Sequence, residues 1–140
     1  MSLEKLQFLR TQRMEQSFIE LQSRKKALEQ WYDHANQQEQ QLIAFQRWRL
    51  HQQETLFANL THQYFDPQTL LDYRAKLEQL QQQEERLRAD LTSTYHSLET
   101  AKQQVQVAKQ QSTQANIKLE KLKEIIKQEH FTKPRAESAQ

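Results

Sequence analysis

Hydrophobic residues recur at heptad spacing through the second half of the chain, in two rows three residues apart. The first row consists of Leu70, Leu77, Glu84, Leu91, Leu98, Val105, Ser112, Leu119 and Ile126, and the second of Tyr73, Leu80, Leu87, Thr94, Ala101, Ala108, Ala115, Leu122 and Glu129. Fourteen of these eighteen positions are apolar or aromatic, and most residues between them are Gln or charged. A strand cannot carry a 3.5-residue period. The pattern therefore predicts one long helix with an apolar seam that needs a partner helix.

The first half of the chain carries a less regular version of the same pattern, which predicts a helix over residues 3–62. Its apolar row consists of Met14, Leu21, Leu28, Ala35, Leu42 and Leu56, and it is flanked by Phe18, Trp31, Tyr32, Phe45 and Leu60. Arg49 interrupts the row. Its long side chain is expected to follow the seam and place its charged group in water.

A turn is predicted at residues 63–68. Asp66 is a candidate N-cap, and Pro67 occupies the first helical position, where a missing N–H is tolerated. Phe65 and Leu70 have the spacing of a hydrophobic staple. The second helix is expected to cover 67–129, because Pro134 disfavours its continuation, and residues 130–140 are expected to form a disordered tail.

These elements predict an all-α fold, a two-helix antiparallel coiled-coil hairpin that forms a single domain over residues 1–140. A short turn makes consecutive helices antiparallel neighbours, each about 90 Å long at 1.5 Å per residue. Folding about residue 65 brings Met14 and Leu21 near Ala115 and Ala108. Large side chains then meet small ones, which favours a monomeric hairpin over parallel pairing of two chains.

Composition limits the classes of function. The chain has no glycine, no cysteine and only two prolines, so neither a compact multi-turn fold nor thiol chemistry is expected. Residues 1–34 and 100–140 hold 14 Lys and Arg against 9 Asp and Glu, a net charge of +5, whereas residues 35–99 hold 6 against 9, a net −3. No signal peptide and no membrane span is expected, which favours a soluble protein of the cytoplasm.

The sequence shows no catalytic motif, so we expect no enzyme activity and no cofactor. No two of the five histidines are three or four residues apart, and a metal site is not expected. Basic residues are not interleaved with stacking aromatics, which argues against nucleic acid binding. The basic run from Arg24 to Lys26 is either a solvated face or a docking surface for acidic groups. Trp48 is either packed at the seam edge or an exposed anchor.

In its architecture the chain resembles the FliJ/YscO family, the stalk proteins of flagellar and type III secretion systems. The resemblance rests on two long Gln-rich helices with one short turn, on residues 42–46 (Leu-Ile-Ala-Phe-Gln) and on residues 73–78 (Tyr-Arg-Ala-Lys-Leu-Glu). It implies that the paired termini insert into a hexameric secretion ATPase and stimulate it. It also implies a contact with the export gate at the cytoplasmic face of the inner-membrane apparatus, and possible binding of escort chaperones.

Two sets of candidate binding residues follow. The basic outer faces of the terminal segments are expected to contact the ATPase through Arg10, Arg13, Arg24, Lys25, Lys26, Lys118, Lys121 and Lys123. The resemblance places the gate contact at Leu42, Phe45, Tyr73 and Leu77, while the family positions that fall on Leu80 and Glu84 match less well. The alternative hypothesis is a stand-alone coiled-coil scaffold that homo-oligomerises and recruits other partners.

Overall fold

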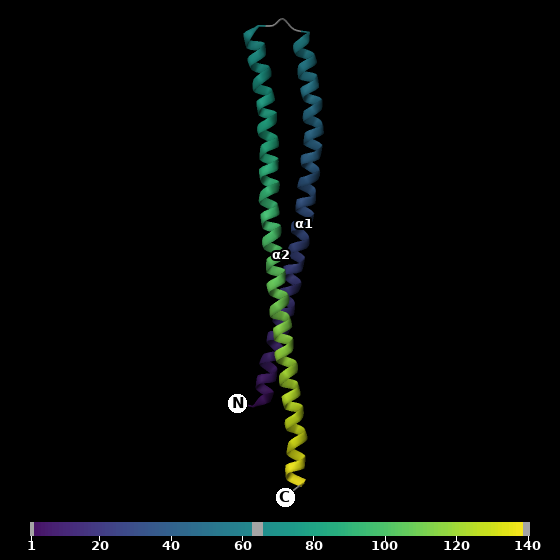
Figure 1. Ribbon diagram of the computed structural model, residues 1–140, viewed down its shortest axis with the longest axis vertical. Coiled ribbons are helices and arrows are strands. Elements are labelled where there is room, and N and C mark those ends of the chain that lie inside the picture. Colours follow the sequence, from purple (N-terminus) through teal and green to yellow (C-terminus); the bar gives the residue numbers. More distant parts are fainter. Residues whose placement is uncertain (1, 63–65, 139–140) are drawn as a thin grey trace. The chain divides into compact units, whose positions relative to one another are not determined.

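The computed structural model describes residues 2–62 and 66–138, with side chains up to Phe131. Two helices make up this part of the chain, α1 (Leu3–Thr61) and α2 (Pro67–Ser138), with no strand among the described residues (Figure 1). Side chains of α1 contact α2 in reverse order, because Arg24 meets Gln104 whereas Arg49 meets Glu84. The prediction of an all-α, antiparallel two-helix hairpin is therefore confirmed.

The hairpin divides into two compact units, and each helix contributes to both. The terminal unit comprises Met1–Glu29 and Thr100–Gln140, and the central unit comprises Gln30–Glu99. Each unit is thus a pair of helical segments, with a seam of its own.

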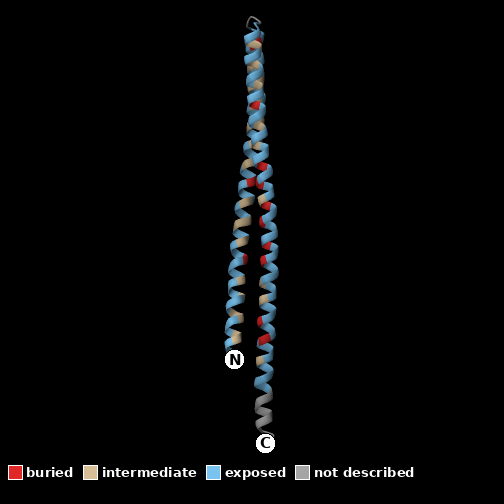
Figure 2. Cartoon of the chain, turned by 90° about the vertical axis from the view of Figure 1, so that its left-hand side faces the viewer, coloured by how far each residue is buried: buried red, intermediate tan, exposed pale blue. Residues whose placement is uncertain are grey.

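The two heptad rows of α2 form its buried face, as predicted. Nine of the eighteen positions are buried, the remaining positions apart from Glu129 are half-buried, and Glu129 is exposed. Leu119 is the most enclosed side chain at 1% exposure. Figure 2 shows the buried residues as short red bands, most of them on α2. Burial one side chain deep is what a two-helix seam allows.

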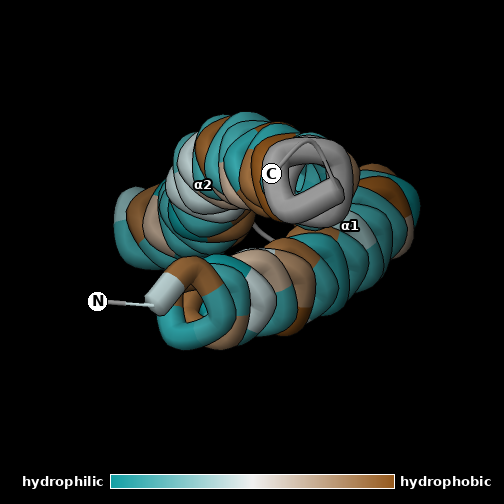
Figure 3. The backbone as a smooth tube through the Cα atoms, turned by 90° about the horizontal axis from the view of Figure 1, so that it is seen from below, coloured by the Kyte–Doolittle hydropathy of each residue, from teal (hydrophilic) through white to brown (hydrophobic). Residues whose placement is uncertain are grey.

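The seam of α1 agrees with the prediction in its first row and in part of the flanking set. In the row, Leu21 and Ala35 are buried and the other predicted apolar positions are half-buried. Of the flanking residues, Leu60 is buried, and Trp31 and Phe45 are half-buried. Phe18 and Tyr32, expected beside the row, are exposed instead. The second row of α1 is largely polar, and its half-buried members are Leu3, Arg10, Ser17, Arg24, Trp31, Gln38, Phe45 and Gln52. Figure 3 shows the resulting mixture of apolar and polar bands along α1.

A large side chain of α1 meets smaller ones of α2 in the apolar cluster of the terminal unit. Leu21 of α1 packs with Val105 and Ala108 of α2, and the half-buried Leu28 packs against this cluster. The predicted approach of Leu21 to Ala108 is confirmed. Small residues on α2 leave room for the longer side chains of α1, so the apolar interior fills without a third element.

Both helices begin with a side-chain cap. The backbone N–H of Thr69 donates to the Asp66 carboxylate at 2.6 Å, which confirms the predicted N-cap before Pro67. This bond to the Thr69 amide lowers the pKa of Asp66. Ser2 caps α1 in the same way, because its Oγ accepts from the N–H of Lys5 at 3.3 Å. Phe65 of the predicted staple lies outside the described residues.

The C-terminal boundary of α2 differs from the prediction. The helix continues through Pro134 to Ser138, so the expected end at Glu129 and the expected disordered tail are wrong for residues 130–138. A proline inside a helix removes one backbone hydrogen bond, here the one to the carbonyl of His130. His130 is exposed, so its carbonyl can bond to water instead, which lowers the penalty.

Within the described residues, neither helix contains a stretch long and apolar enough to cross a membrane.

Candidate functional site

A basic groove lies between the helices in the terminal unit. Arg10 and Arg13 of α1 and Lys118 of α2 line a cavity of about 250 Å³. The rest of its lining is small or neutral, and consists of Gln16, Ser17, Gln111, Gln114 and Ala115. Arg10 belongs to the polar second row of α1, so its stem is half-buried at the seam. Three of the predicted ATPase-binding residues are thus brought together in one place.

Arg24 differs from these three residues because its guanidinium is already bonded within the hairpin. Its Nε donates to Glu20 at 2.8 Å and its Nη1 donates to Gln104 of α2 at 3.0 Å. The Glu20 carboxylate partly neutralises the charge, and the Gln104 bond uses a second donor. Arg24 therefore ties the two helices together, and it offers less to a partner than the sequence suggests.

The remaining predicted basic residues are spread over exposed helix surface. Lys25 and Lys26 follow Arg24 on α1, and Lys121 lies on α2; all three are exposed. Lys123 is also exposed and lies 3.5 Å from Glu120 in a pair along the helix. Such exposed pairs contribute little to stability, so Lys123 stays accessible to a stronger acidic partner.

The charge difference between the two units is larger than the sequence segments suggest. The terminal unit holds 14 Lys and Arg against 8 Asp and Glu, a net charge of +6, and the central unit holds 6 against 10, a net −4. A local field of one sign attracts partners of the opposite charge and speeds their encounter. The terminal unit is therefore the part of the molecule best suited to an acidic partner.

The predicted gate-binding residues lie on the seam. Leu42, Phe45, Tyr73 and Leu77 are all half-buried, because each occupies a heptad position that faces the other helix. Tyr73 lines a groove of about 210 Å³ with Leu56 and Leu60 of α1. Leu56 is eleven residues from Phe45, about 16 Å along a helix. The structure therefore does not join the four residues into one patch.

Trp48 is exposed to 48%, so its indole is not enclosed by the seam. The ring centroids of Trp48 and Phe45 are 5.5 Å apart, in a tilted arrangement. Trp48 also borders a shallow groove with Leu56, Lys76 and Leu80. Trp48 therefore rests against the seam edge and still presents much of its surface, and its role as a binding anchor stays a prediction.

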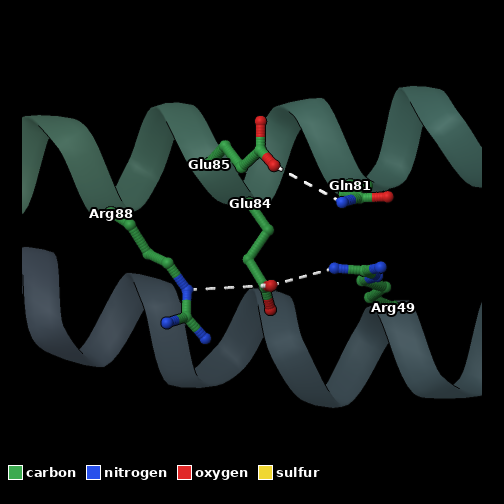
Figure 4. A network of polar contacts seen from close by, with 5 residues as sticks. All are labelled: Arg49, Gln81, Glu84, Glu85 and Arg88. Atoms are coloured by element: carbon green, nitrogen blue, oxygen red, sulfur yellow. Dashed lines mark hydrogen bonds and ion pairs between the residues drawn. The ribbon is translucent and has the colours of Figure 1, made fainter.

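A charged layer interrupts the apolar seam of the central unit (Figure 4). Arg49 of α1 donates through Nη1 to the Glu84 carboxylate of α2 at 2.9 Å, and their side chains are only 19% and 17% exposed. Arg88, one turn further along α2, places its Nε 3.7 Å from the same carboxylate oxygen. The expectation that Arg49 would place its charge in water is wrong, because a partner lies opposite on the seam.

Sequence reasoning missed this pairing although the signal was present. Arg49 and Glu84 each interrupt a heptad row, and a fold about residue 65 brings them near one another. A second cross-helix contact of the central unit had a weaker signal in the sequence. The Tyr95 hydroxyl donates to the Glu39 carboxylate, and this bond raises the pKa of Tyr95.

No group of three or more metal-ligating side chains comes together in the described part of the chain. Comparison of the chain with protein-family models, with curated proteins and with solved structures finds no match.

Proposed function

We propose that this protein is the central stalk of a type III secretion export apparatus, of the injectisome or flagellar kind. Its paired terminal segments enter the central opening of a hexameric secretion ATPase and stimulate turnover. The central unit links the ATPase to the export gate, and escort chaperones are possible further partners. The observation that carries this proposal is the basic groove of Arg10, Arg13 and Lys118 on the terminal unit of a two-helix hairpin.

The groove fits this role through its charge and its chemistry. A single shaft touches six subunits from one side at a time, so its contacts must be polar and tolerant of rotation. Arginine and lysine at a helix surface give long-range attraction and several alternative hydrogen bonds. Arg10, Arg13 and Lys118 form no ion pair among the described residues, whereas Arg24 is held by Glu20. These three cations are the stronger candidates for the ATPase contact.

Charge reversal within the groove tests the proposal. Arg13→Glu combined with Lys118→Glu should reduce stimulation of the cognate ATPase roughly tenfold at low salt, because two attractive contacts become repulsive. The difference should shrink as ionic strength rises. The measurement is ATP turnover, titrated with wild-type and variant protein, with circular dichroism to verify that helix content is unchanged.

A matched control reverses two exposed cations of the central unit, Arg74→Glu with Arg86→Glu. This variant has the same change in net charge and should stimulate turnover as the wild type does. If the groove variant stimulates turnover as strongly as the wild type does, or if the wild type gives no stimulation, the scaffold hypothesis is favoured instead. That hypothesis has one observation in its favour, an exposed apolar row on the central unit.

A further inference from the structure

The central unit exposes a heptad row of large apolar side chains that the hairpin does not use. Ile43, Leu50 and Phe57 of α1 are 49%, 62% and 58% exposed. They are seven residues apart, so they line one side of the helix at the spacing of a coiled-coil seam. Among the described residues, no other three exposed large apolar side chains follow one another at this spacing. We call this set the outer row.

The outer row is separate from the seam with α2. The seam in this part of α1 runs through Leu42, Arg49 and Leu56, which precede the outer-row residues by one position each and are half-buried. An apolar row that repeats every seven residues is satisfied by another helix with the same repeat. On α2, the exposed positions directly after the seam residues Leu77, Glu84 and Leu87 are Glu78, Glu85 and Arg88, so they form no matching apolar row. The row therefore fits one helix packed on α1.

Charges beside the row decide the direction of that helix. Arg47 and Glu54 are exposed, lie next to the outer row at heptad spacing, and have no ion-pair partner in the described part of the chain. If two copies of α1 pack antiparallel with Leu50 opposite Leu50, then Ile43 lies opposite Phe57, and Arg47 of each copy comes within one residue of Glu54 of the other. A parallel pair would place the Arg47 and Glu54 residues of the two copies on opposite edges of the contact, where they could not pair.

We propose that the outer row is a self-association surface on which a second copy of this chain docks, α1 against α1, antiparallel and two-fold symmetric about Leu50. The contact is isologous, because the same surface is used on both copies. It departs from the monomer expected from the sequence, since that expectation weighed only the seam that the hairpin itself satisfies. The proposal uses residues of the central unit alone and does not rest on the stalk function.

The pair is weak. Three apolar side chains and two flanking charges on each copy bury less than the roughly 1,200 Å² of a stable specific interface. Dissociation constants in the micromolar range or above are expected, so single copies predominate at low concentration. This leaves the terminal unit of a single copy available for an ATPase.

The first test is sedimentation equilibrium over a wide concentration range. Wild-type protein should pass from monomer to dimer, and Leu50→Gln should weaken the dimer by roughly a hundredfold, because a polar group is placed at the symmetry axis in both copies. The control, Leu71→Gln, changes a side chain of equal type and 58% exposure on α2 and should leave the dimer unaffected. A wild type that is monomeric throughout, or equal dimerisation of Leu50→Gln, overturns the proposal.

Charge exchange tests the direction. Arg47→Glu alone and Glu54→Arg alone should each weaken the dimer roughly tenfold, and the double exchange should restore it. Restoration would not follow from a general loss of helix stability, since the two residues lie two turns apart and do not contact one another. Failure of the double variant to recover excludes the antiparallel pair.

Cross-linking gives an independent answer, because the chain has no cysteine of its own. A disulfide needs two Cα atoms within about 7 Å. Ile43→Cys mixed with Phe57→Cys should form a cross-linked heterodimer on mild oxidation, whereas Ile43→Cys alone should not cross-link to itself. Self-linking of Ile43→Cys would indicate a parallel pair and would contradict the proposal. Retention of the mixed cross-link by the Arg13→Glu, Lys118→Glu variant would separate this surface from the ATPase contact.

Discussion

The terminal and central units solve the same packing problem in different ways. Both are two-helix seams built on heptads, yet the terminal unit matches sizes, with Leu21 packed on Val105 and Ala108. The central unit matches charges, with Arg49 paired to Glu84 inside the seam. Size matching gives tighter burial, whereas a charged layer gives specificity with less stability. One chain therefore holds a basic unit whose seam matches side-chain sizes and an acidic unit whose seam matches charges.

The largest effect is expected from truncating the most enclosed residue of the terminal unit. Leu119→Ala should lower the free energy of unfolding by about 2–3 kcal/mol, the low end for a buried leucine, because a two-helix seam is close to solvent. Leu91→Ala in the central unit should cost less, because Leu91 is 9% exposed against 1% for Leu119. Urea denaturation followed by circular dichroism measures both.

The control for that comparison is Ile117→Ala, on the same helix at 46% exposure, which should change stability little. Equal losses of unfolding free energy for Leu119→Ala and Leu91→Ala would contradict a difference in packing between the units. A larger loss for Leu91 would reverse it.

A smaller effect is expected from the charged layer. Arg49→Leu or Glu84→Leu alone should each cost about 1–3 kcal/mol, because the remaining charge is half-buried without its partner. The double variant should be closer to wild type in stability than either single variant. A double-mutant cycle measures the coupling, and additive losses would show that the two residues do not act as a pair.

The heptads of α2 were predictable in detail, because most of its seam residues are apolar and most of its other residues are polar. The seam of α1 was predictable in its first row and at Trp31, Phe45 and Leu60, but not elsewhere. Arg10, Ser17 and Arg24 lie at the seam although their chemistry suggests surface, and Phe18 and Tyr32 are exposed although theirs suggests core. The heptad spacing of the more regular row of α1 decides which of its residues face α2, whatever the polarity of the side chains in the second row. Polar side chains at the edge of the seam can still reach water.

The candidate site was less predictable than the fold. Hydropathy shows where basic residues are, but cross-helix neighbours decide which of them are free. Arg24 is bonded to Gln104, eighty positions along the chain, whereas Arg13 and Lys118 share an open groove. The gate residues taken from the family resemblance fell on the seam, because a resemblance in architecture does not fix which helix face is turned outward.

The smallest expected effect is a difference between the two helix caps in how their contribution to stability depends on pH. The folded-state pKa of Asp66 lies below its ordinary value of 3.8 because the carboxylate accepts from Thr69. Its contribution is thus fully present above that ordinary value and is lost as pH falls through the lower, folded-state pKa. Asp66→Asn should remove this pH dependence, since asparagine caps without a titrating group.

Ser2 supplies the matched case in the terminal unit, because its hydroxyl does not titrate in this range. Ser2→Ala should lower the melting temperature slightly and by the same amount at every pH. Thermal melts between about pH 2 and pH 6 test both variants. A Ser2→Ala effect that changes with pH, or an Asp66→Asn melt that still follows the wild-type pH profile, would contradict the assignment of the caps.

The charged layer also bears on longitudinal slip between the helices of the central unit. A uniform apolar seam looks the same after a shift of seven residues, so two such helices can slide by one heptad with little change in their contacts. Here that shift would move Glu84 opposite Leu42 or Leu56, and Arg49 opposite Leu91 or Leu77. Either displacement leaves two half-buried charges against leucine. The Arg49–Glu84 pair thus fixes the axial register of the two helices, and it resists an axial load on one helix until the ion pair breaks.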